Sequence, residues 1–253
     1  MRILITNDDG IGAFGIKSLV EALNGMGELY VVAPERERSA VGHAITMHKP
    51  LRANRVSHFG PGVKAWAVNG TPSDCVKLGV EALLEKEPDV VFSGINRGPN
   101  LGTDVLYSGT VSAAIEGAIL GIPSAALSLA SFEADDYSVA CDFAAALADN
   151  IFSKGLEKDT LLNVNVPALK RSEIKGVSVT SLGTRRYRNS FEARKDPRGQ
   201  EYFWMSGEAV DEYNNDDCDL NLITQGYITV TPIHFDLTKF DMISRIKEWE
   251  FHI

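Results

Sequence analysis

Two adjacent carboxylates, Asp8 and Asp9, follow the first apolar segment of the chain, residues 2–6. Neighbouring carboxylates repel each other, so the pair costs stability unless a cation or a basic side chain compensates the charge. Carboxylate oxygens are also the ligands that hard cations such as Mg²⁺ prefer. Aspartates are common in turns and at helix starts as well, where one of them caps the next helix. The very apolar segment before the pair favours a cation site over a surface turn.

Two later segments carry polar side chains that suit the same site. Asn96 follows the apolar segment 89–95 and offers a neutral carbonyl oxygen, although taken alone it is typical of a turn. Ser108, Gly109 and Thr110 open an alanine-rich segment. The free N–H groups and hydroxyls of such a helix start can bind an anion such as phosphate. Serine and threonine are equally typical of a helix N-cap, and the two roles are compatible.

The segments around these residues alternate between strand and helix patterns. Their order predicts an α/β fold with a doubly wound, mostly parallel sheet, in which sites lie at the carboxyl ends of the strands. If the strands that end before Asp8 and Asn96 are neighbours, these side chains lie close together. We expect residues 1–175 to form this catalytic core. Strands are expected at 2–6, 29–33, 51–56, 64–68, 89–95, 123–130 and 161–166, and helices at 14–26, 71–85, 110–120 and 137–152.

Residues 176–253 follow a different pattern, with strand-like pieces at 177–182, 202–205 and 227–231 and fewer helices. Residues 185–198 hold six basic side chains against two acidic ones, and residues 208–219 hold six acidic side chains and no basic one. These stretches are either two solvated loops or a β-rich hairpin arm at about 184–220 that projects from the core. Their opposite charges would help to register subunits in an oligomer. A final strand and helix are expected to return to the core.

The composition limits the class of protein. The 253 residues carry a net charge of −9, which argues against a partner such as a nucleic-acid duplex, since that needs a basic face. No apolar run approaches the roughly 20 residues of a membrane span, and the first apolar segment is too short for a secretory signal. The three cysteines, Cys75, Cys141 and Cys218, are sparse and odd in number, as in a reducing cytoplasm. We therefore expect a cytoplasmic protein that binds no membrane.

Three other sites fit parts of the same segment. Residues 10–15 match G-x-G-x-x-G, the pattern of a dinucleotide-binding loop, with Glu35 placed for a ribose. However, Asp8 and Asp9 would face the pyrophosphate and repel it. A receiver-type signalling module needs a phosphate-accepting aspartate after a later strand, where this chain has Asn96. A phosphatase of the haloacid dehalogenase type needs D-x-D, and Gly10 stands at the second position.

Long motifs along the chain resemble those of the survival protein SurE family. They are MRILITNDDG at 1–10, PERERSAVGHAIT at 34–46, VNGTPSDCV at 68–76, SGINRGPNLGTDVLYSGTVSAA at 93–114 and GIPSAALS at 121–128. The resemblance extends nearly end to end, including TVTPI at 229–233. It implies a Rossmann-like core with a C-terminal oligomerisation region that builds a homodimer or homotetramer, partly by exchange of arms.

The resemblance also implies an activity and a set of ligands. Family members are metal-dependent phosphatases that hydrolyse nucleoside 5′- and 3′-monophosphates, and some cleave short polyphosphate. The implied ligands of one Mg²⁺ or Mn²⁺ per subunit are Asp8, Asp9, Ser39 and Asn96. Ser108, Gly109 and Thr110 would then hold the phosphate, and His43 is a candidate to protonate the leaving oxygen, or else a loop residue. The alternative function is a metal- or nucleotide-binding switch without turnover.

Overall fold

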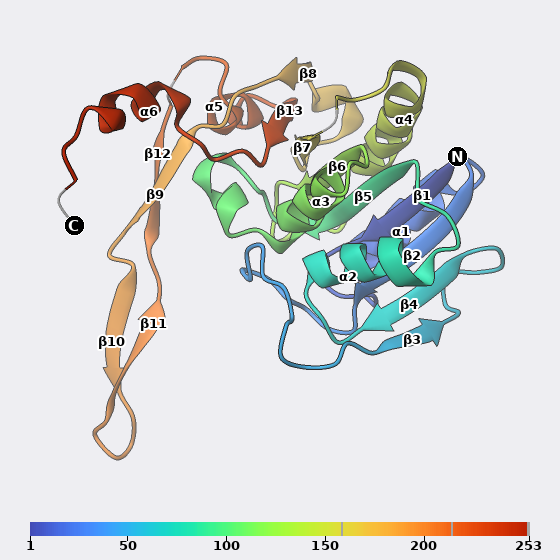
Figure 1. Ribbon diagram of the computed structural model, residues 1–253, viewed down its shortest axis with the longest axis horizontal. Helices are drawn as coiled ribbons and strands as arrows, with labels where there is room; N and C mark the ends of the chain where they lie inside the picture. Colours follow the sequence, from blue (N-terminus) through green and yellow to red (C-terminus); the bar gives the residue numbers. More distant parts are fainter. Residues whose placement is uncertain (158, 214, 252–253) are drawn as a thin grey trace.

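The computed structural model describes residues 1–157, 159–213 and 215–251, and it contains a nine-stranded sheet in the order β3-β4-β2-β1-β5-β6-β7-β13-β8 (Figure 1). Six adjacent strands are mutually parallel, as the alternating pattern predicts. They are β4 (Lys64–Val68), β2 (Glu28–Pro34), β1 (Arg2–Thr6), β5 (Val90–Arg97), β6 (Ser124–Leu129) and β7 (Thr160–Val166). The predicted α/β class with a doubly wound, mostly parallel sheet is therefore confirmed.

Antiparallel pairing closes both sides of this parallel core. β3 (Ala53–Val56) runs antiparallel to β4 at one edge. At the other side β13 (Tyr227–His234) runs antiparallel to β7 and carries β8 (Gly176–Val179) beside it. Both β8 and β13 come from the region after residue 176. That region therefore extends the main sheet as well as forming an arm.

Two helical layers cover the sheet because strand side chains alternate between its faces. Ile3 and Ile5 of β1 pack in the same apolar cluster as α1 (Phe14–Leu23) and α4 (Ser138–Lys154), and α1 contacts α4 directly. Leu4 points the other way, into a cluster with α2 (Pro72–Leu78) and α3 (Gly109–Ile119). All three β1 side chains are fully buried, so the strand that leads to Asp8 is held on both faces.

The start of α2 follows its predicted chemistry. The Thr71 hydroxyl accepts the Asp74 N–H at 3.0 Å, the Asp74 carboxylate accepts the Thr71 N–H at 2.9 Å, and Pro72 occupies the first helical position. The regular helix is shorter than expected and continues as one π-helical turn, η1 (Gly79–Leu83). The helical turns η2 (Gly102–Leu106) and η3 (Arg171–Glu173) and the short helix α5 (Asp219–Thr224) were not predicted.

The predicted β-rich arm is present as two consecutive antiparallel ribbons that project from the body (Figure 1). β9 (Thr184–Arg188) pairs with β12 (Glu208–Glu212), and β10 (Phe191–Lys195) pairs with β11 (Glu201–Met205). Its opposite charges meet within one chain: Arg185 binds Asp211 at 2.6 Å, and Arg186 lies 3.5 Å from Glu212. The expected role of these stretches in registering subunits stays a prediction.

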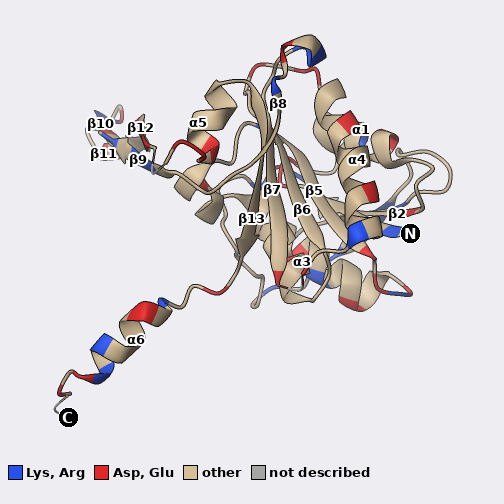
Figure 2. Ribbon diagram, turned by 90° about the horizontal axis from the view of Figure 1, so that it is seen from above, with Lys and Arg blue, Asp and Glu red and all other residues tan. Residues whose placement is uncertain are grey.

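The structure corrects the expectation that the last helix returns to the core. α6 (Phe240–Lys247) does not return to the core, since none of its residues is buried, and Figure 2 shows it extending away from the body. Its sequence has the helical pattern of an amphipathic segment, but the surface that would cover its apolar side is not supplied by the described part of this chain. Among the described residues, no helix is long and apolar enough to cross a membrane.

Candidate active site

The two segments that carry Asp8, Asp9 and Asn96 meet at one edge of the sheet. β1 and β5 are parallel neighbours, with Thr6 opposite Ser93. From β1 the chain winds toward β2, and from β5 it winds toward β6, so their carboxyl ends flank the switch point of the sheet. The backbone N–H of Arg97 donates to Asp9 Oδ2 at 3.1 Å, which joins the two loops directly.

Asp8 lies at the amino end of α3. It is only 4% exposed, and its Oδ1 accepts the hydroxyl hydrogen of Thr110. Burial raises the pKa of the Asp8 carboxyl to about 6, while the hydrogen bonds from Thr110 act in the opposite direction. The neighbouring Asp9 carboxylate raises it further. A cation bound beside a buried carboxylate supplies the positive charge that offsets the cost of its ionisation, so a buried acid of this kind is a candidate cation ligand.

Glycine at position 109 permits this approach. A Cβ on Gly109 would lie 2.8 Å from the Asp8 Cβ and 2.9 Å from Asp8 Oδ2, closer than real Cβ contacts allow. Ser108 caps the same helix, since its hydroxyl accepts the Val111 N–H at 3.1 Å. The helix start therefore offers its remaining N–H groups beside the Asp8 carboxylate, and such groups attract anions.

The loop after β2 adds a second side to the site. The Arg38 N–H donates to the Asp8 carbonyl at 2.7 Å, which places residues 37–39 against the carboxylate loop. The Ser39 hydroxyl donates to Glu37 at 2.9 Å. Burial raises the pKa of Asp9, the Arg97 N–H opposes that shift, and the charge of Glu37 adds to the rise. Glu37 was missed in the sequence because a lone acid in a polar loop carries no pattern.

Asn96 presents the remaining oxygen. Its amide nitrogen donates to the Gly98 carbonyl at 2.8 Å, which leaves the side-chain oxygen as the atom available to a cation. Asp8, Asp9, Ser39 and Asn96 together offer carboxylate, hydroxyl and amide oxygens. Oxygen ligands suit Mg²⁺ or Mn²⁺ and do not suit softer metals. Nowhere in the described chain do three His, Cys, Asp or Glu side chains gather as a metal cluster, and this predicted set contains only two acids.

His43 is held away from the carboxylates. Its Nε2 donates to Glu116 Oε2 at 2.7 Å, and Glu116 is a buried residue in the later turns of α3 that also lies 3.6 Å from Lys77. The loop that carries His43 is tied down a second time where Thr46 donates twice to Asp74, at 2.9 and 2.6 Å. Among the described residues, no hydrogen bond or ion pair joins His43 to Asp8, Asp9 or Asn96.

A hollow of about 380 Å³ lies between α1 and the start of α4 and is lined by residues from Phe14 to Ala22 and from Asp135 to Ala145. Phe14 and Tyr137 line it with their ring centroids 5.7 Å apart, and Phe14 is 64% exposed. Burial raises the pKa of Tyr137, and the Asp9 carboxylate raises it further, so this ring is within electrostatic reach of the site. Sequence reasoning missed Tyr137, because only the tertiary fold brings the start of α4 to the end of β1.

Comparisons with known proteins agree with this architecture. The pattern of a protein family described as Survival protein SurE matches residues 3–189. A protein of Heliobacterium modesticaldum named 5′-nucleotidase SurE is 53% identical over 249 residues, which cover 98% of this chain and 92% of that protein. A protein of Moorella thermoacetica with the same name is 56% identical over 240 residues, covering 95% of this chain and 92% of its own.

A solved structure has the same fold over nearly the whole chain. The crystal structure of the SurE protein from Aquifex aeolicus matches with a TM-score of 0.85 and 41% sequence identity, and the match covers 98% of both chains. The matched regions include every loop that carries a candidate site residue.

Proposed function

This chain belongs to the survival protein SurE family, and we propose that it is a metal-dependent phosphatase that hydrolyses nucleoside 5′-monophosphates to nucleoside and phosphate. We extend the proposal to nucleoside 3′-monophosphates and short polyphosphate. The relatives named 5′-nucleotidase SurE support the reaction class. The observation that carries the proposal is the buried Asp8 carboxylate bound by Thr110 at the start of α3. This contact places a candidate cation ligand directly beside a helix start that can bind an anion.

One divalent cation, Mg²⁺ or Mn²⁺, would be held by Asp8, Asp9, Ser39 and Asn96. When bound, such a cation polarises the phosphoryl group and offsets the charge of the transition state. Asp8 and Asp9 balance its two charges. The Arg97 N–H keeps the Asp9 carboxylate in place at 3.1 Å. The proposed set is consistent with the raised pKa of both carboxyls, because a bound cation would offset the cost of ionising these partly or fully buried groups.

Ser108, Gly109 and Thr110 would bind the phosphate. The backbone N–H groups of the first turn of α3 have no partner within their own helix, apart from the one that Ser108 caps. They are able to donate to phosphate oxygens, and the helix dipole favours the negative charge there. Thr110 keeps its hydroxyl on Asp8, so it orients that carboxylate beside the helix start.

His43 is the proposed proton donor for the leaving oxygen. Glu116 accepts the hydrogen of Nε2, which fixes the ring and leaves Nδ1 as the nitrogen that can hold the transferred proton. A carboxylate that orients a histidine in this way is a common arrangement in acid–base catalysis. The His43 loop would have to approach the substrate for this role.

The hollow between α1 and the start of α4 would receive the nucleoside. Phe14 and Tyr137 offer aromatic surface to a base, while Asp135, Asp136 and Glu21 on its rim are able to accept hydrogen bonds from hydroxyl and amino groups. The same acids would repel a phosphate, so the phosphate end of the substrate faces α3. Because an aromatic ring can stack on any base, we expect the hollow to accept several bases.

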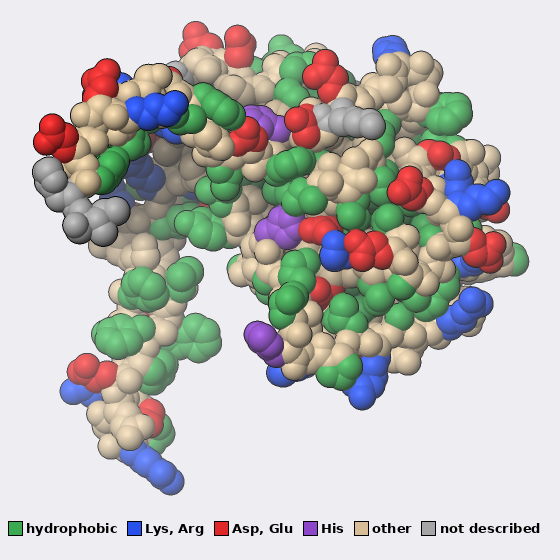
Figure 3. Space-filling view, in the orientation of Figure 1, with side chains coloured by type: hydrophobic (Ala, Val, Ile, Leu, Met, Phe, Trp, Pro, Cys, Tyr) green, Lys and Arg blue, Asp and Glu red, His purple; other side chains and the backbone are tan. Residues whose placement is uncertain are grey.

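We also propose a homo-oligomer, a dimer or a tetramer, assembled through the arm. Phe191, Phe203, Trp204 and Met205 are each at least 58% exposed on the outer ribbon. Figure 3 shows hydrophobic side chains along the arm. A two-stranded ribbon is only marginally stable alone, and exposed apolar patches of this kind mark protein interfaces. Light scattering of the full chain and of a chain lacking residues 187–200 tests this, since the deletion should lower the mass.

Release of inorganic phosphate tests the proposed reaction. The full chain is incubated with AMP, GMP, 3′-AMP and tripolyphosphate, with Mn²⁺ or Mg²⁺ and with excess chelator. Release from the 5′-monophosphates that requires the cation is the expected result. If no nucleoside monophosphate is hydrolysed while Mn²⁺ and nucleotide still bind, the chain is instead a metal- or nucleotide-binding switch without turnover.

A further inference from the structure

The base of the arm is bound to the loop that leads into the proposed phosphate site, and we propose that Asp104, Arg185 and Tyr187 are positioning residues for that site. The inference rests on the proposed function, because it assigns a role toward the same phosphate. It goes beyond assembly: the arm would also set how well the start of α3 receives the substrate.

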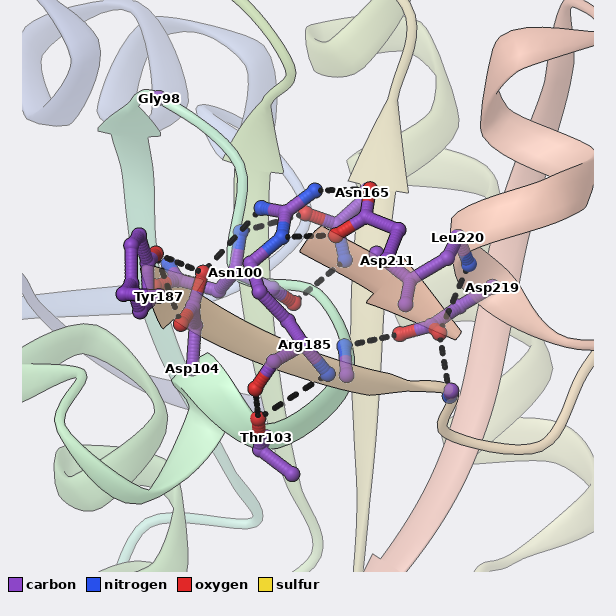
Figure 4. A network of polar contacts seen from close by, with 12 residues as sticks. Gly98, Asn100, Thr103, Asp104, Asn165, Arg185, Tyr187, Asp211, Asp219 and Leu220 are labelled. Carbon is purple, nitrogen blue, oxygen red and sulfur yellow. Dashed lines mark hydrogen bonds and ion pairs between the residues drawn. The ribbon is translucent and has the colours of Figure 1, made fainter. Parts of the chain in front are cut away.

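Asp104 is the link, because it bonds in two directions. Its backbone carbonyl accepts the N–H of Tyr107 at 3.0 Å and the N–H of Ser108 at 3.2 Å, so it shapes the turn that ends at the helix cap. Its carboxylate accepts Arg185 Nη1 at 3.1 Å and the Tyr187 hydroxyl at 3.0 and 2.9 Å. Figure 4 shows Asp104 with Arg185 and Tyr187 of strand β9. One residue of η2 therefore joins the arm to Ser108.

Arg185 fixes this link to both strands of the inner ribbon. Its Nε and Nη2 donate to the two oxygens of Asp211 on β12, at 2.6 and 2.8 Å. The Arg185 side chain is only 15% exposed, and its carboxylate partners are 17% and 23% exposed. Bidentate, partly buried ion pairs of this kind hold their side chains more rigidly than exposed ion pairs do. The Arg185 backbone also exchanges hydrogen bonds with the Thr103 hydroxyl.

Other C-terminal elements hold the same loop from its inner side. The fully buried Asp219 accepts the N–H groups of Gly102 and Gly183, each at 2.8 Å. Asn165 of β7 binds both the N–H and the carbonyl of Asn100, at 2.8 and 2.9 Å. The loop between Asn96 and Ser108 is thus fastened by segments that lie far away in sequence, and Arg185 with Tyr187 supplies its outer attachment (Figure 4).

The arrangement predicts a selective effect. Among the described residues, no hydrogen bond or ion pair joins Asp8 or Asp9 to η2 or to the arm, so loss of the arm contact should spare the cation. The turn before Ser108 would be less restrained, and phosphate would bind more weakly. Mutations within such networks change coupling by amounts that correspond to roughly 2- to 30-fold.

Arg185→Ala is the test, and Arg186→Ala is its matched control. Arg186 is the next residue on the same strand and also pairs with an acid across the ribbon, Glu212, but its side chain is 69% exposed. Tyr187→Phe is a milder second variant that removes only the hydroxyl on Asp104. Each variant is compared with the wild-type chain for the KM and kcat of AMP hydrolysis, for Mn²⁺ and orthophosphate affinity by calorimetry, and for mass by light scattering.

We expect Arg185→Ala to raise the AMP KM and the orthophosphate Kd about 3- to 30-fold, with Mn²⁺ affinity and mass unchanged. Tyr187→Phe should show a smaller shift of the same kind, and Arg186→Ala should stay within about twofold. Asp104→Asn combined with Arg185→Ala should cost less than the two single effects added together, because each single change already disrupts the Arg185–Asp104 ion pair.

The inference is overturned if Arg185→Ala and Tyr187→Phe leave orthophosphate Kd and KM within twofold of wild type. It is also overturned if Mn²⁺ affinity or mass falls in step with phosphate affinity, since the contact would then be only structural, or if the wild-type chain binds no orthophosphate beside Mn²⁺. A wild-type chain that binds orthophosphate but hydrolyses no nucleotide contradicts the proposed function instead, and calorimetry still decides the role of Arg185.

Discussion

Replacing Gly109 by alanine should damage the site while leaving the fold intact. The new Cβ would lie 2.8 Å from the Asp8 Cβ and 2.9 Å from Asp8 Oδ2, whereas ordinary contact begins at 3.4 Å. Because the surrounding interior is close-packed, the Asp8 side chain or the helix start has to move by roughly 0.6 Å. The Asp8 backbone cannot follow freely, since its carbonyl is bound to the Arg38 N–H at 2.7 Å.

A displacement of this size has a predictable cost. A reacting group misplaced by about 1 Å can lose about 100-fold in rate, so we expect kcat/KM to fall roughly 10- to 100-fold. Alanine is a better helix former than glycine by about 1 kcal/mol, which offsets part of the steric strain. The thermal midpoint should therefore change little. The assay is steady-state phosphate release from AMP with Mn²⁺, beside a thermal melt and a Mn²⁺ titration.

Gly12→Ala is the matched control for this change. Gly12 lies in the loop directly after the carboxylates, its φ is not in the positive range, and a Cβ there meets nothing within 4 Å. This variant should stay within about twofold of wild type, as surface changes without contacts usually do. If Gly109→Ala keeps kcat/KM and Mn²⁺ affinity within threefold, or if Gly12→Ala loses as much activity, the close packing of Asp8 on α3 is not what organises the site.

Three further predictions concern pH, the proton donor and the nucleoside. The fold raises the pKa of Asp8 from an ordinary 3.8 to about 6. Between pH 3.8 and about pH 6, Asp8 therefore keeps its proton in the native state and has lost it in the unfolded chain. The free energy of unfolding without metal should fall as pH rises through that window, by about 3 kcal/mol. Apparent Mn²⁺ affinity should fall up to tenfold per pH unit below 6. Chemical denaturation would measure the change in the free energy of unfolding from pH 4 to 8, and calorimetry would measure the change in Mn²⁺ affinity. If neither quantity depends on pH in this range, the raised pKa of Asp8 is refuted. His43→Ala should lower kcat at least 100-fold if the ring donates a proton, and Glu116→Gln should lower kcat less. If both variants lose less than tenfold in kcat, and both lose the same thermal stability, His43 and Glu116 only anchor the loop. Phe14→Ala should raise the KM for AMP about 10-fold, because stacking of a base on an aromatic ring is worth about 1–3 kcal/mol. The KM for tripolyphosphate, which has no base, should not change, and the control Phe152→Ala on an exposed turn of α4 should change neither KM. Equal changes of KM for both substrates would exclude the hollow as the nucleoside site.

Sequence patterns predicted the parallel core because its strands are buried on both faces and leave continuous apolar runs. β1 and β5 are examples, and their adjacency brings Asp9 and Arg97 into contact as the strand-end argument requires. The outer ribbon of the arm shows the opposite case. All residues of β10 and β11 are exposed, so burial selects no face of either strand. The piece at 202–205 was still predicted as strand-like and lies in β11, whereas β10 was not predicted.

The candidate site was only partly visible in sequence for the same physical reason. Paired acids and a capped helix start have local signatures, so Asp8 and Ser108 were found from the residues themselves. Ser39 came only from the family resemblance, because a serine in a polar loop has no distinguishing neighbours. The links of Tyr137 to Asp9 and of Arg185 to Asp104 depend on tertiary contacts between distant segments, and no local pattern encodes them.

Asp8 carries the central claim, because it is proposed both to bind the cation and to meet the phosphate-binding helix. The decisive measurement is phosphate release from AMP as a function of Mn²⁺ concentration, by the wild-type chain and by Asp8→Asn at equal protein concentration. Wild-type release should depend on Mn²⁺, and the variant should be at least about 1000-fold slower even at saturating Mn²⁺, since charge stabilisation by the cation is worth several kcal/mol. An Asp8→Asn chain that reaches a near-wild-type rate at saturating Mn²⁺ would contradict the claim, and so would wild-type release that is unaffected by removal of the cation.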